Sequence, residues 1–255
     1  MWTMPKENAD TGKHEDRDFH DEIIRHLTDA KARSQGIAVE YLDQPEAERA
    51  ERFSRFLARR YYRDRLSRGF RYSAKLVHGQ SAADHVPDSA QFESILDSCV
   101  LGSMATSRAV GELAVTHLVP FRGEEWWSEL LEYERAFFLQ VATSEATPPS
   151  KFPKRSTSTV VRTFEFDLPE LLVRLRSKDI PTEASRRACT LLFSRTHVGR
   201  VYVVELDASS AAVLDAVDGN TTLERIPSLR TISVTETQGV FTNLAEVGAI
   251  VVPSA

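Results

Sequence analysis

The fold of this chain is decided by residues 190–251, which begin TLLFSRTHVGRVYVVELDASSAAVLDAVDGNTTLERI at Thr190 and end VFTNLAEVGAIV at Val251. Two short apolar runs flank His197-Val198-Gly199, and this spacing predicts two strands joined by a turn. A helical pattern follows, then Asp218-Gly219 as a stop signal, a second short helix, and a last helix that ends at Gly248. A small sheet with one open edge beside a helix is a shape that binds an extended peptide.

The composition is typical of a soluble globular protein. The 255 residues include 42% hydrophobic and 27% charged residues, with a formal net charge of -5. This acidic balance argues against a dedicated nucleic-acid binder, and no apolar run approaches the roughly 20 residues that cross a bilayer. The N-terminus lacks the apolar core of a signal peptide, so we expect a cytoplasmic protein with no membrane partner. Cys99 and Cys189 are too few for a disulfide framework and predict two buried free thiols.

The patterning changes once along the chain. Residues 1–16 are polar and predict a disordered tail, whereas residues 17–142 predict a helical domain whose strongest helix covers residues 124–141. The segment 143–159 (TSEATPPSKFPKRSTST) is a linker by composition. Residues 160–255 predict a small domain of strands and helices. The expected fold class is therefore α+β, with an all-helical N-terminal domain.

An arginine-rich helix is predicted to follow Gln44-Pro45, and nine arginines lie between Arg49 and Arg71. Three interpretations stay open for it. The arginines form a solvated face that pairs with carboxylates at helical spacing, or dock an acidic protein, or contact phosphates with aromatic stacking. The pattern places Phe53, Phe56, Leu57 and Tyr61 on one apolar face, and the candidate carboxylates are Glu46, Glu48, Glu51 and Asp64.

No residues form a recognisable catalytic or metal-binding motif. Glu134 falls inside the apolar stripe of the strongest helix, where a carboxylate must be paired. We expect an ion pair with an arginine near Arg60 rather than a catalytic acid. The seven histidines lack metal-ligand spacing, although His78 and His85 share a loop, and nucleophile and cofactor motifs are absent. The sequence therefore predicts no catalytic residue, no metal ligand and no cofactor in this chain.

The C-terminal part resembles PqqD-like peptide recognition elements, which are winged-helix-like domains that bind the leader region of ribosomally made peptides. The resemblance implies a three-stranded antiparallel sheet with three helices, and a precursor peptide as ligand. It is carried by the strand Val201–Leu206, the capping turn Asp207–Ser210 with Ser209 or Ser210 as the N-cap, the helix Ala211–Val217, the turn Asp218–Thr222 and the helix Phe241–Val247.

The helices with the sequences YYRDRL (residues 61–66) and LLEYERAFF (residues 130–138), followed by the Pro-rich linker, carry a second resemblance. This part of the chain resembles the TglI-like and MbnC/HvfC-type accessory partners of multinuclear non-heme iron-dependent oxidative enzymes. The resemblance implies a heterodimer with a TIM-barrel enzyme that holds the iron, and a peptide whose cysteine is modified, as in 3-thiaglutamate biosynthesis. A DNA-binding winged-helix regulator is the alternative.

These resemblances and the open strand edge together give the candidate site residues. A peptide added as a strand gains main-chain hydrogen bonds, while the neighbouring helix forms a second wall. The predicted peptide-binding residues are Val201, Tyr202, Val203, Val204 and Glu205 on the strand and Val240, Asn243, Leu244 and Val247 on the last helix. The predicted partner-docking residues are Arg59, Arg60, Tyr61, Tyr62 and Arg63.

Overall fold

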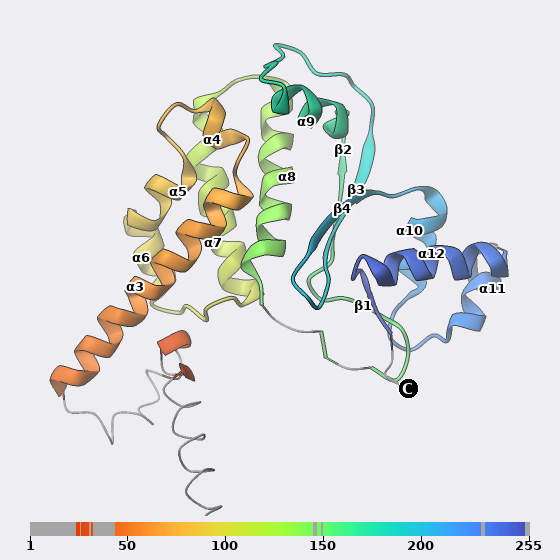
Figure 1. Cartoon of the computed structure of the whole chain (residues 1–255), viewed down its shortest axis with the longest axis horizontal. Helices are drawn as coiled ribbons and strands as arrows, with labels where there is room; N and C mark the ends of the chain where they lie inside the picture. The colour runs from red at the N-terminus through yellow and green to blue at the C-terminus, as the bar shows by residue number, and fades with distance from the viewer. Residues whose placement is uncertain are drawn as a thin grey trace, which may run out of the picture.

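The computed structural model describes residues 24–25, 27–30, 32, 44–144, 147–148, 150–230 and 233–252. The predicted tail at residues 1–16 lies outside this set. The described chain combines helices with a small three-stranded antiparallel sheet, which confirms the mixed α+β class (Figure 1).

The N-terminal part is helical, as predicted, and serines begin several of its helices. Ser81, Ser89 and Ser103 each accept a hydrogen bond from a backbone N–H three residues later, which satisfies a donor that the helix leaves unpaired. The elements are α3 (Gln44–Gly69), α4 (Ser73–Leu76), α5 (Ala82–His85), η1 (Val86–Asp88), α6 (Ala90–Leu96), α7 (Met104–Leu118), η2 (Val119–Phe121) and α8 (Glu125–Ala142).

Helix α3 buries a different face from the one that the sequence predicted. Phe53 and Phe56 are 49% and 52% exposed, because the small Ser54 and Ala58 begin the buried stripe instead. Gly69, at the last position of α3, lets the helix approach α8 closely, because a Cβ there would lie 2.6 Å from the Cβ of Phe138. The buried stripe repeats every four residues. The buried residues are Ser54, Ala58, Tyr62, Leu66 and Phe70.

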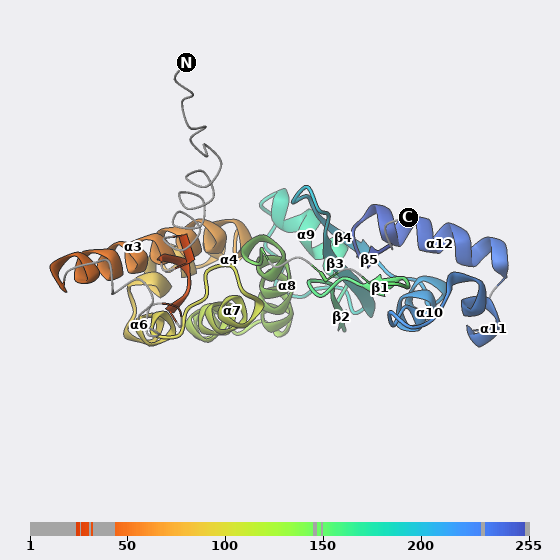
Figure 2. The same cartoon turned by 90° about the horizontal axis from the view of Figure 1, so that it is seen from below.

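Helix α8 lies between the helical part and the sheet, as Figure 2 shows. It packs on α3 and α7 on one side and on all three strands of the sheet on the other. Tyr133 meets Phe193 of the sheet edge-to-face, with ring centroids 5.3 Å apart. Because both sides are covered, most of the helix is buried, including Trp126, Trp127, Leu130, Leu131 and Phe138.

The C-terminal part contains the sheet in the order β2-β3-β4. Phe193 of β3 pairs with Val160 of β2 and Val203 of β4, and both pairings are antiparallel. The elements are β1 (Lys154–Arg155), β2 (Val160–Phe164), α9 (Leu168–Arg176), β3 (Cys189–Arg195), β4 (Val201–Glu205), α10 (Ala208–Ala216), η3 (Leu223–Arg225), α11 (Ile226–Arg230), α12 (Val234–Glu246) and β5 (Ile250–Val251). Asp207, rather than the predicted Ser209 or Ser210, caps α10 by accepting from Ser210 N over 2.7 Å.

The two faces of the sheet belong to two cores. Leu191 and Phe193 join the core of the helical part, whereas Leu192 points to the opposite face and packs with α10, α12 and β5. The two predicted domains therefore share a continuous core through α8 and the sheet.

The C-terminal end of the predicted linker 143–159 is part of the folded structure. β1 pairs with β5, and Ser156 N donates to Ala249 O over 2.9 Å. Ser156, Ser158 and Thr159 are buried. Cys99 and Cys189 are both buried, as predicted, and neither forms a disulfide. None of the helices in the described ranges combines the length and the apolar character needed to cross a membrane.

Candidate functional site

The β3–β4 hairpin carries the predicted site, and the structure confirms its turn. Thr196 N donates to Arg200 O and Gly199 N donates to Thr196 O, each over 2.9 Å. Gly199 has φ +83, a conformation that favours glycine, and His197 lies in the turn beside it. The tip of this hairpin lies against the C-terminal end of α12 (Figure 1), where a Cβ on Gly248 would meet Arg195 O at 2.5 Å.

The outer edge of β4 presents a row of backbone groups. Leu206 N donates to Thr190 O, so the residues of β4 at even positions turn their N–H and C=O groups toward β3. Those of Val201, Val203 and Glu205 therefore point away from the sheet. In the part of the chain that the structure describes, no backbone group pairs with them. Together they form an open edge with the spacing that an added strand requires.

The side chains of β4 alternate between the two faces of the sheet. Val203 packs on the core that contains α8, whereas Val204 is 38% exposed on the face that carries α10 and α12. Glu205 pairs with Arg187 over 2.7 Å, and Arg187 also binds Asp167. A charged cluster thus flanks the C-terminal end of the edge.

The C-terminal end of helix α12 lies against the hairpin at Ser194 and Arg195, but the wall that the sequence predicted on this helix is only partly available. Leu244 is 4% exposed and belongs to the core, so the prediction that it contacts a peptide is wrong. Val240 and Val247 are half-buried against the same core, and Asn243 is exposed. The accessible part of the wall is therefore Asn243 with the outer edges of the two valines.

A groove of about 950 Å³ opens at the tip of the hairpin, beyond the Val201 end of β4. The guanidinium of Arg195 lies in it and donates to Thr143 O. None of the predicted peptide-binding residues lines this groove. Ser156 and Ser158, which line it, lie in the segment that is a linker by composition, so the sequence pattern does not indicate a site there. The lining includes Ser144, Ser156, Ser158, Arg195, His197 and Val198.

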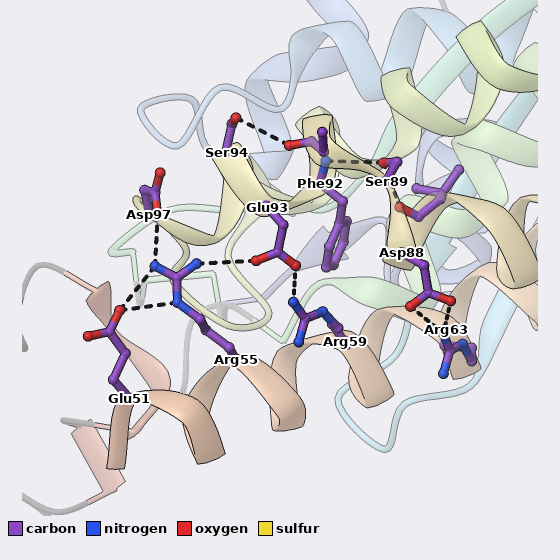
Figure 3. Close-up of polar contacts among 12 residues, drawn as sticks. Glu51, Arg55, Arg59, Arg63, Asp88, Ser89, Phe92, Glu93, Ser94 and Asp97 are labelled. Carbon is purple, nitrogen blue, oxygen red and sulfur yellow. Dashed lines mark hydrogen bonds and ion pairs between the residues drawn. The ribbon is translucent and has the colours of Figure 1, made fainter. Parts of the chain in front are cut away.

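The second candidate region is the arginine-rich helix, and Figure 3 shows a ladder of ion pairs along it. Arg55 pairs with Glu93 and Asp97, Arg59 with Glu93, and Arg63 with both oxygens of Asp88. Because α6 and η1 run back along α3, successive turns of α3 meet successive carboxylates. Pairs at helical spacing are also present, as predicted: Glu51 with Arg55 and Asp64 with Arg68.

Some of the predicted docking residues are engaged within the chain, and others are exposed. Arg59 and Arg63 are held within the chain, and Tyr61 donates its hydroxyl to Ala142 O over 2.8 Å. Tyr62 is fully buried, so its assignment to a docking surface is wrong. Arg60 is exposed and has no ion-pair partner among the residues described. The sequence missed this division because the partners Asp88, Glu93 and Asp97 lie far along the chain.

Glu134 is buried, but its partners are backbone groups and not an arginine. Its carboxylate accepts from Tyr72 N over 2.5 Å and from Ser73 N over 3.2 Å. Burial raises the pKa of Glu134 to about 7, although these hydrogen bonds and Arg71 oppose the rise. The predicted ion pair is therefore wrong, and the side chain joins α8 to the start of α4.

Two histidines form a small cluster on the helical part. His85 stacks on His117 with ring centroids 5.4 Å apart, and their ring nitrogens contact Gly79 O and Gln80 O. His78, with φ +39, lies in the same loop. Within the described ranges, no three His, Cys, Asp or Glu side chains are grouped so that they could hold a metal ion.

Comparison with known proteins does not assign the chain to a family. No protein-family model matches the chain, and no curated protein matches it significantly.

Proposed function

We propose that this chain is a non-catalytic accessory subunit that binds a ribosomally made precursor peptide along β4. It presents the cysteine-bearing end of that peptide to an iron-dependent TIM-barrel enzyme. The observation that carries the proposal is the open edge of β4, where the backbone groups of Val201, Val203 and Glu205 point away from the sheet. Each outward residue offers one donor and one acceptor, so a peptide strand gains hydrogen bonds without any change in the fold.

The order of the elements in the C-terminal part supports the interpretation of this part as a PqqD-like, winged-helix-like domain. The hairpin β3–β4 leads into α10, a turn at Asp218-Gly219 follows, and α12 returns beside the sheet. Gly219 has φ +85, consistent with its role as a stop signal. A groove lined by the turn residues 196–199 lies at the hairpin tip and offers space to peptide residues that run beyond Val201.

We assign the oxidative chemistry to the partner enzyme. Glu134, the carboxylate that the sequence singled out, is fully buried and bonded to backbone N–H groups. A carboxylate in that position holds two helices together and does not reach a substrate.

The ion-pair ladder on α3 is the reason we prefer peptide recruitment over DNA-binding regulation. Arg55, Arg59 and Arg63 are neutralised by carboxylates of the same chain, which reduces the positive charge that phosphates would meet. A gel-shift assay at low salt that detects duplex binding would reverse this preference.

The proposal is tested with the full chain and a synthetic copy of the short cysteine-bearing peptide encoded nearest to it. Val201→Pro, at the first residue of β4, removes one outward N–H while leaving the bonds between β3 and β4 in place. We expect this variant to bind the peptide at least about tenfold more weakly, because one hydrogen bond and the fit of the strand are lost.

Thr163→Pro is the matched control. Residues of β3 at odd positions bond to β2, so the N–H of Thr163 points outward at the opposite edge of the sheet. Peptide binding should survive this substitution. Equal losses in both variants, or a loss in Thr163→Pro alone, would contradict binding at β4. Co-purification of the tagged chain with a TIM-barrel iron protein, identified by mass spectrometry, tests the partner.

A further inference from the structure

The face of α3 opposite the core carries a stripe of arginine and phenylalanine. We call Arg49, Arg52, Phe53, Phe56 and Arg60 the outer stripe. They lie at positions i, i+3, i+4, i+7 and i+11, which places them on one side of the helix. The buried residues of α3, from Ser54 to Leu66, lie on the other side.

The outer stripe differs from an ordinary solvated face. Phe53 and Phe56 are 49% and 52% exposed, and their rings stack with centroids 6.4 Å apart. The three arginines are exposed, and in the described ranges no carboxylate lies within ion-pair distance of them. Two adjacent exposed phenylalanines between unpaired arginines form the kind of surface that is enriched in protein interfaces.

The neighbouring side of α3 also carries arginines, and it shows what kind of segment packs on an arginine-aromatic surface in this protein. There Arg55, Arg59 and Arg63 are covered by α6 and η1 (Figure 3). The covering segment supplies carboxylates at both ends and an aromatic ring between them, since Phe92 meets Tyr62 edge-to-face at 6.1 Å. The molecule thus already pairs an arginine-aromatic face of α3 with a short amphipathic segment, residues 86–97, whose carboxylates are Asp88, Glu93 and Asp97.

From this internal example we infer that the outer stripe docks an acidic amphipathic helix of the partner protein. The apolar side chains of that helix pack on Phe53 and Phe56, and its carboxylates pair with Arg49, Arg52 and Arg60. The stripe spans eleven residue steps, about 16 Å, which matches three turns of a helix laid along it. The inference rests on the proposed function only in assigning this helix to the partner enzyme.

The same surface fits a nucleic acid less well. Three arginines in about 16 Å neutralise few phosphates, and Phe53 and Phe56 stack on each other instead of presenting separate faces to bases. An acidic helix satisfies the charges and the apolar rings together.

The test uses the full chain and a synthetic amphipathic helix of about 20 residues, long enough to form three turns. The peptide carries phenylalanine and leucine on one side, flanked by glutamates, and titration is followed by NMR of the labelled chain. We expect the amide signals of the outer stripe to shift. Phe53→Ser with Phe56→Ser should weaken binding at least about tenfold, and Arg49→Glu with Arg52→Glu should also remove its salt dependence.

Arg108→Glu is the matched control, because Arg108 is an exposed arginine on α7, outside the stripe. It should bind as the wild type does, and a peptide with glutamine in place of glutamate should not bind. Absence of binding at millimolar peptide, equal binding by wild type and stripe variants, or stripe-dependent binding of a single-stranded oligonucleotide instead would overturn the inference. Because the probe contains neither the precursor peptide nor an iron enzyme, these results leave the test of the β4 edge independent.

Discussion

The hydroxyl of Ser194 donates a hydrogen bond of 2.8 Å to the backbone carbonyl of Val247, and so ties β3 to the C-terminal end of α12. The proposed peptide site has two walls, β4 and α12. This contact fixes their relative position, because it holds the helix against the sheet. Ser194 is fully buried, so its hydroxyl has no access to water.

Ser194→Ala should therefore lower the free energy of unfolding by about 1 kcal/mol, since it removes a hydrogen bond whose donor is buried. Chemical denaturation measures this loss. Ser94→Ala is the control, because the Ser94 hydroxyl is exposed and bonds only within its own helix. A change near zero is expected there, and equal losses for the two variants would remove the special role of Ser194.

The turn after α12 makes a second prediction. Gly248 has φ +77, and a Cβ there would lie 2.5 Å from Arg195 O. Gly248→Ala should destabilise the protein by about 1–3 kcal/mol for the backbone conformation, with the steric overlap adding to this. Gly239→Ala, within the same helix and with open space around it, should instead stabilise by about 0.5–1 kcal/mol. Thermal unfolding of the two variants should move in opposite directions.

Glu134 predicts a pH dependence of stability. Burial raises its pKa from an ordinary value of 4.5 to about 7, so the folded state holds a proton that the unfolded state releases. Its contribution to stability is fully present below pH 4.5 and is lost as the pH rises through about 7. The rise corresponds to about 3 kcal/mol.

Glu134→Gln stays neutral at every pH and therefore lacks this loss. The difference in unfolding free energy between wild type and Glu134→Gln should shift in favour of the variant from pH 5 to pH 8, as measured by urea denaturation. A constant difference across this range would show that Glu134 keeps an ordinary pKa.

Local patterns predicted the hairpin, helix α8 and the turn at Gly199, because each depends on neighbours in sequence. The face of α3 was predicted wrongly, since Phe53 and Phe56 dominate the apolar pattern whereas Ser54 and Ala58 are buried through their small size. The Ser54 hydroxyl donates to Leu27 O, and Ser54 and Ala58 line a small pocket together with Leu96. These neighbours lie far along the chain, and one helix alone does not reveal them.

The sequence likewise predicted only part of the candidate site. The open edge of β4 followed from its pattern, but Leu244 and Tyr62 were assigned to binding surfaces although both are buried. The partners of the arginines, the pairing of β1 with β5 and the hairpin-tip groove all join segments far apart in sequence. Such contacts are set by tertiary packing, which local propensity does not encode.

Residue-resolved hydrogen exchange along β4 tests the central claim most directly. In the free chain, the amides of Val201, Val203 and Glu205 should exchange rapidly, while those of Tyr202, Val204 and Leu206 are protected by β3. Addition of the precursor peptide should slow exchange at the first three and leave the others unchanged. Peptide binding that leaves Val201, Val203 and Glu205 in rapid exchange would contradict strand addition at this edge.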